Sequence, residues 1–114
     1  PTTADGQSKM TDWLTANPTK KHVLVCTIAD LMAFGINNAT KAAGRTDQVA
    51  AIGIGGSPDG SKLLESGNSG SFVGTVDFQF GKYGDYAVPM VQDLLDGKAI
   101  PADVRPQLTV VAAK

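Results

Sequence analysis

Hydrophobic and polar residues along this chain form blocks that predict helices and strands in strict succession. In residues 3–17, Met10, Trp13 and Leu14 recur at helical spacing, which indicates an amphipathic helix with a narrow apolar stripe. Asp5 is the expected N-cap of this helix. A polar segment then leads into the first of several short apolar runs.

Two continuous apolar runs, at residues 22–26 and 48–54, have the length of strands. Neither run alternates with polar residues, so we expect both strands to be covered on both faces, as in a parallel sheet. Between them, residues 30–44 predict a helix that is capped by Asp30 and ended by Gly44. The expected inward face of this helix consists of Met32, Ile36, Ala39 and Ala43, with Leu31, Gly35 and Ala42 beside them.

A glycine-rich turn at residues 55–60 follows the second run. Pro58 suits the first turn of a helix, and Gly67 is its expected stop. Residues 71–76 contain enough β-branched residues, in alternation, to predict a third strand.

The C-terminal part predicts a helix at residues 83–96 and a strand at residues 107–111, joined by a proline-bounded linker at residues 100–106. Pro89 lies within the helix and is expected to kink it or to delay its regular start. The side chains expected to face inward are those of Met90, Val91, Leu94 and Leu95.

Three predicted loops follow the carboxyl ends of the strands, at residues 27–30, 55–59 and 77–80. The carboxyl ends of parallel strands lie along one edge of a sheet, where ligands bind in open α/β folds. Two interpretations stay open from the pattern alone. The edge binds a ligand, or its glycines, caps and proline only shape turns.

The composition fits one soluble domain and offers no catalytic set. The 114 residues are 42% hydrophobic and 18% charged, and the net charge of −1 gives no basic surface for nucleic acid. His22 is the only histidine, and Cys26, expected to be an inert core thiol, is the only cysteine. Asp93 and Asp96 are expected on a solvated helix face. We therefore predict no enzyme activity, no cofactor and no metal site.

The order of these segments resembles the type I periplasmic sugar-binding proteins, the ribose- and galactose-binding relatives that serve ATP-binding-cassette (ABC) importers. The resemblance spans residues 5–111 and rests on ADLMAFGINNATKAAG at 29–44, GIGGSPDG at 53–60, TVDFQ at 75–79 and LLDGK at 94–98. It implies an α/β fold with a Rossmann-like three-layer parallel sheet. The same core occurs in lactose-repressor-type regulators.

The resemblance implies that residues 1–114 form only the C-terminal portion of a two-lobed protein. Segments 77–79 and 100–106 would be hinge crossings, and the helix at 83–96 would pack on the missing first lobe. Such a piece leaves a strand edge unpaired, which favours pairing with another chain. We therefore expect a processed product or a piece of a longer chain, either dimeric or rearranged by domain swapping.

The resemblance also implies a ligand site at the loops. Ala29 stands where relatives carry a polar residue, often Asn, that bonds the sugar. Gly55 stands where they carry an Asp that binds sugar hydroxyls. Asp30 is expected to act mainly as a helix cap, whereas Gly56 and Ser57 offer a backbone amide and a hydroxyl to the ligand.

Phe78 occupies the position of a ligand-binding Gln in the relatives. Its ring is expected either to stack on a pyranose or to pack the hinge. Asp77 and Gln79, the other hinge residues, should alternate away from it. The loss of three polar ligands argues against a ribose- or galactose-like site. It favours a different polyol, a less hydroxylated ligand, or recognition by the missing lobe.

Two functions of different class follow from the resemblance. In the first, the protein closes its lobes over a sugar or polyol and delivers it to the membrane permease of an ABC importer. Its location would be periplasmic or extracellular, and membrane-associated through the transporter. In the alternative, the chain is the effector-binding domain of a lactose-repressor-type transcriptional regulator. A stand-alone flavodoxin-like enzyme is a weaker option, because no phosphate-cradling or catalytic set is present.

Overall fold

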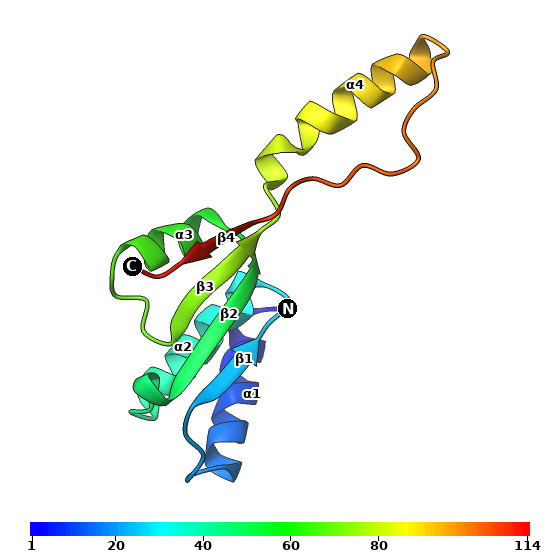
Figure 1. Ribbon diagram of the computed structural model, residues 1–114. Coiled ribbons are helices and arrows are strands. Elements are labelled where there is room, and N and C mark those ends of the chain that lie inside the picture. The colour runs from blue at the N-terminus through cyan, green and yellow to red at the C-terminus, as the bar shows by residue number, and fades with distance from the viewer.

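The computed structural model describes all residues, 1–114, and shows an α/β body with a projecting arm (Figure 1). The helices are α1 (Thr3–Ala16), α2 (Asp30–Ala42), α3 (Pro58–Glu65) and α4 (Tyr83–Leu95). The strands are β1 (Val23–Cys26), β2 (Val49–Gly55), β3 (Phe72–Asp77) and β4 (Thr109–Ala112). Two short 3-10 helices are η1 (Thr46–Gln48) and η2 (Phe80–Lys82). Every helix and strand predicted from the pattern is present, with ends shifted by a few residues.

The four strands form one sheet in the order β1-β2-β3-β4. The predicted parallel pairing of the first three strands is confirmed by the registers Val23↔Val49 and Ile54↔Val76. The sheet is mixed because β4 runs antiparallel to β3, with Asp77 opposite Thr109. β4 enters the sheet at the end where β3 leaves it, since the arm returns there (Figure 1).

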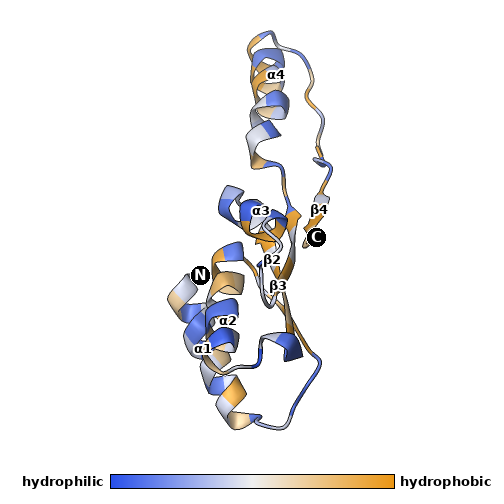
Figure 2. Ribbon diagram, turned by 90° about the vertical axis from the view of Figure 1, so that its left-hand side faces the viewer, coloured by the Kyte–Doolittle hydropathy of each residue, from blue (hydrophilic) through white to orange (hydrophobic).

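Helices cover only one face of this sheet, so the body has two layers instead of the expected three (Figure 2). Successive right-handed crossovers between neighbouring parallel strands place α2 and α3 on the same side. A single core joins the helices to that face. It consists of Met10, Leu14, Ala33, Ile36, Ala39, Val49, Ala51, Leu64 and Phe72.

The second face of the sheet is uncovered in this chain. Leu24 of β1 and Val110 of β4 are 66% and 77% exposed. Cys26 is exposed as well, so the prediction of a core thiol is wrong for this chain. The continuous apolar runs that predicted covering on both faces are real, but the chain contains no element that packs on the second face.

The first helix is capped by Thr2, not by the predicted Asp5. The Thr2 hydroxyl accepts a hydrogen bond from the Asp5 amide, and the Asp5 carboxylate accepts from the Thr2 amide, which together form a capping box. The hydrogen bonds from the Thr2 side chain and backbone lower the pKa of Asp5. The predicted apolar stripe is confirmed, because Met10 and Leu14 are buried and Trp13 packs against the core.

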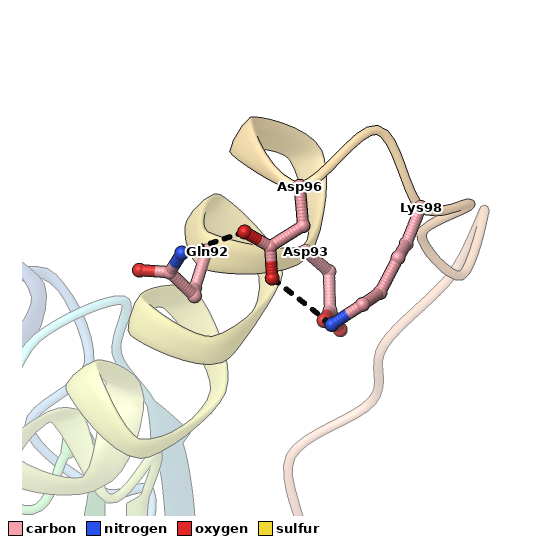
Figure 3. A network of polar contacts seen from close by, with 4 residues as sticks. All are labelled: Gln92, Asp93, Asp96 and Lys98. Carbon is pink, nitrogen blue, oxygen red and sulfur yellow. Dashed lines mark hydrogen bonds and ion pairs between the residues drawn. The ribbon is translucent and has the colours of Figure 1, made fainter.

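The last helix, α4, projects away from the body and buries none of its residues (Figure 1). Of the residues predicted to face inward, Met90 is half-buried, whereas Val91, Leu94 and Leu95 are exposed, Leu95 by 77%. At its C-terminal end, Lys98 bridges Asp93 and Asp96 at 3.1 and 3.0 Å, and Gln92 donates to Asp96. Figure 3 shows these four side chains together. Hydrogen bonds to Asp96 and then Asp93 raise the pKa of Lys98. No helix of the chain has both the length and the apolar character needed to cross a bilayer.

Candidate functional site

A cavity of about 850 Å³ opens at the carboxyl ends of the parallel strands, where the sheet joins the arm. Its lining residues come from three stretches that are far apart in the sequence and from β4. They are Ala29, Asp30, Leu31, Ile54, Gly55, Gly56, Ser57, Pro58, Asp77, Gln79, Phe80, Gly81, Lys82 and Thr109. The three predicted loops therefore do meet at one edge of the sheet.

Five of the six residues predicted to bind ligand line this cavity, namely Ala29, Asp30, Gly55, Gly56 and Ser57. Phe78 is not among the lining residues. Its ring packs edge-on against Phe80, with 5.6 Å between the ring centroids. Contact of any of these residues with a ligand stays a prediction.

The carboxylate of Asp30 does not cap its own helix, which corrects the sequence-based expectation. The N-cap of α2 is Ala29, and no side chain caps this helix. Asp30 is buried, and its Oδ2 accepts from the Ser57 amide at 2.7 Å while its Oδ1 accepts from the Thr75 hydroxyl at 2.6 Å. Asp30 thus joins α2 to the loop after β2 and to β3.

Glycines make room for this buried carboxylate. A Cβ at Gly53 would collide with Oδ1 of Asp30, and a Cβ at Gly60 would lie 2.9 Å from Oδ2. Because both oxygens already accept bonds from the protein, Asp30 is better suited to bracing the cavity wall than to holding a ligand.

The turn between β2 and α3 needs glycine at two successive positions. Gly55 has φ of 129° and Gly56 has φ of 64°, a region that other residues rarely adopt. Ser57 follows as the N-cap of α3, and its hydroxyl oxygen accepts from the Gly60 amide at 3.1 Å. The Ser57 hydroxyl proton remains available to donate.

In the third loop, the residues that line the cavity differ from the one expected to bind ligand. Asp77 and Gln79 line the cavity, and Phe80, 58% exposed, lines it in place of Phe78. Gln79 adopts the left-handed region with φ of 54°, which turns the chain after β3. No pattern of apolar residues signals a left-handed glutamine, so the alternation alone does not reveal Phe80.

The cavity has few ionisable groups. Asp30, Asp77 and Lys82 are the only ionisable side chains in its lining. No three metal-ligating side chains cluster anywhere in the chain. The arrangement combines one aromatic ring, glycine backbone and a few polar groups, as in sites that bind small neutral ligands.

Residues 2–99 match the family model described as a periplasmic binding protein domain. The D-allose-binding periplasmic protein of Escherichia coli (strain K12) is 32% identical over 101 residues, which are 89% of this chain and 31% of that protein. The chain therefore spans about a third of the length of this curated relative.

Solved structures of similar fold include solute-binding proteins of ABC transporters. One from Actinobacillus succinogenes 130z, with bound D-allose, has a TM-score of 0.85 and 24% identity over 97% of this chain and 37% of its own. Another, from Agrobacterium vitis with bound allitol, has a TM-score of 0.85 and 25% identity over 96% of this chain and 38% of its own. These relatives are solute-binding proteins and not enzymes, and none of these matches favours a repressor-type regulator.

Proposed function

Since this chain belongs to the periplasmic binding protein domain family, we propose that it forms one wall of a cleft that binds a sugar or polyol. The observation that carries the proposal is the cavity where the carboxyl ends of three parallel strands converge. Open α/β sheets bind ligands at that edge. Structural relatives hold D-allose and allitol.

The mechanism proposed for the whole protein is closure of two lobes over the ligand. Segments 77–79 and 100–106 would be the crossings that absorb the motion. The side-chain amide of Gln79 donates to the backbone oxygen of Gln107 at 3.0 Å, so the two sides of the arm are linked at its base. In this proposal α4, with its exposed apolar residues, packs on the first lobe.

The proposed partners are a small polyhydroxylated solute and the membrane permease of an ABC importer. The proposed location is the periplasm or the outer surface of the cell, with membrane association through the transporter. For the 114-residue chain alone, we propose association into dimers or swapped forms, because the second sheet face and α4 expose apolar residues.

A binding measurement on the full-length protein that contains this chain tests the function. D-allose, allitol and D-fucose serve as probes, with L-leucine as a non-carbohydrate control. A ligand at 100 times its dissociation constant stabilises the folded state by about 2.7 kcal/mol, which a thermal shift detects. If none of the three compounds shifts the melting temperature, the proposed sugar-binding function is wrong.

Two glycines provide matched variants for the location of the site. Gly56 and Gly67 have similar φ values of 64° and 69°, so alanine costs the backbone about 1 kcal/mol at either position. Only Gly56 lines the cavity, and a Cβ there would collide with the side chain of Asp77. We expect Gly56→Ala to weaken polyol binding at least tenfold and Gly67→Ala to leave it unchanged; equal affinities would place the site elsewhere.

A further inference from the structure

The carboxylates of Asp30 and Asp77, which both line the cavity, differ in how many of their oxygens accept hydrogen bonds from the protein. Asp30 is buried and accepts hydrogen bonds at both oxygens. Asp77 accepts only at Oδ1, from the Gln79 amide at 2.6 Å. Its Oδ2 receives no donor from the protein, and Asp77 makes no ion pair, although Lys82 lines the same cavity.

The absence of a side chain at Gly56 leaves room for the Asp77 carboxylate. Gly55 pairs with Asp77 across β2 and β3, and the side chain of Asp77 lies over Gly56, where any Cβ would collide with it. The Asp77 carboxylate of β3 therefore lies against the backbone of the turn at Gly55 and Gly56. Its Oδ1 is fixed by the turn at Gln79, which orients the group before a ligand arrives.

We propose that Asp77 is the charged acceptor that selects the ligand, and that its Oδ2 receives a hydrogen bond from a hydroxyl of a neutral polyhydroxylated compound. This assignment rests on the proposed sugar-binding function. A hydrogen bond to an ionised carboxylate is about twice as strong as a neutral one, so it dominates a site with few polar groups. The two carboxylates against one ammonium group disfavour an anionic ligand.

The test compares Asp77→Asn with wild type in the full-length protein by titration calorimetry with D-allose, allitol and D-fucose. Asparagine keeps an oxygen for the Gln79 amide, so the turn is retained. We expect at least a tenfold loss of affinity with an unchanged melting temperature in the absence of ligand. Asp47→Asn is the control, since Asp47 is exposed in η1 and outside the cavity.

A double-mutant cycle with monodeoxy forms of the tightest-binding polyol identifies the hydroxyl. One deoxy compound should bind wild type more weakly than the parent compound does. The same deoxy compound and its parent should bind Asp77→Asn with equal affinity. If wild type binds a polyol and Asp77→Asn binds it equally well, the assignment of Asp77 is wrong while the proposed function stands. If ligand-free stability falls together with affinity, Asp77 is structural and the assignment is also overturned. If wild type binds none of the three probes, both proposals fail.

Discussion

The buried carboxylate of Asp30 shapes the cavity without any basic partner. Two neutral donors, the Ser57 amide and the Thr75 hydroxyl, satisfy it, and it lies in the first turn of α2, where the helix dipole favours negative charge. A buried carboxylate held only by hydrogen bonds tolerates little change around it. The conformation of the loop at Ser57 therefore depends on this one side chain.

Replacing Asp30 by alanine should destabilise the protein strongly. Asp30→Ala leaves the donors of Ser57 and Thr75 without their partner, and we expect a loss of about 2–4 kcal/mol in the free energy of unfolding. Asp59→Ala is the control, because Asp59 is an exposed acid in the first turn of α3; its effect should stay within about 0.5 kcal/mol. Urea unfolding of the full-length protein measures both, and equal small effects would show that Asp30 is not a brace.

How far the sequence predicts individual side chains depends on whether their partners are local. Gly44, with φ of 64°, ends its helix as its neighbours in the chain predict, whereas at α1 the local pattern predicted Asp5 as the cap and the structure has Thr2. The partners of Asp30 are 27 and 45 residues away, so the sequence suggests only the local alternative, a helix cap. The expectation for Phe78 came from its position in the family resemblance, and the left-handed turn at Gln79 next to it is not signalled by any pattern of apolar residues.

Arg45 holds the C-terminal end of α1 and the chain after it. Its Nη1 donates to the carbonyl oxygens of Leu14 and Asn17, both at 3.2 Å, its Nη2 donates to that of Lys20, and its Nε donates to Gln48. The terminal carbonyls of a helix have no partner within the helix and carry partial negative charge, so a guanidinium suits them well.

We expect Arg45→Lys to lower the free energy of unfolding by about 1–3 kcal/mol, because a single ammonium group cannot reach all these acceptors. Lys41→Ala removes an exposed cation from the last turn of α2 and serves as the control. Guanidinium unfolding curves of the two variants give the comparison. A loss no larger than that of the control would mean that water replaces these bonds without cost.

Order and type of the secondary structure elements are predictable here because each has a distinct period, glycine stop or cap in the sequence. The sequence does not predict which element, if any, packs on each apolar face of the sheet and of α4. The apolar residues of β1 and α4 predict burial, yet Leu24 and Leu95 are exposed in this chain. The antiparallel entry of β4 is set by the returning arm, which a strand pattern does not encode.

The overall dimensions reflect this open architecture. The chain measures 62 × 27 × 20 Å with a radius of gyration of 18.2 Å, whereas a compact domain of this length has about 13 Å. The difference arises from the arm that carries α4 (Figure 1). A body with two uncovered apolar surfaces has a strong tendency to associate.

The 114-residue chain by itself should therefore self-associate in a concentration-dependent way, as light scattering can measure. Leu95→Lys places a charge among the exposed apolar residues of α4 and should reduce the association constant several-fold. Gln7→Lys adds the same charge at an exposed position of α1, on the body instead of the arm, and should change the association constant little. A stable monomer with a cooperative melt at all concentrations would contradict this expectation.

The lack of any buried residue in α4 also bears on how this segment folds. An isolated helix of 13 residues is marginal in water, because its nucleation cost is repaid only by tertiary packing. Because α4 buries none of its residues against another element, we expect its amide protons to exchange with solvent faster than those of the sheet and of α2. Helix formation in this segment and its docking against another surface are thus thermodynamically coupled, so that whatever α4 docks on also completes its folding.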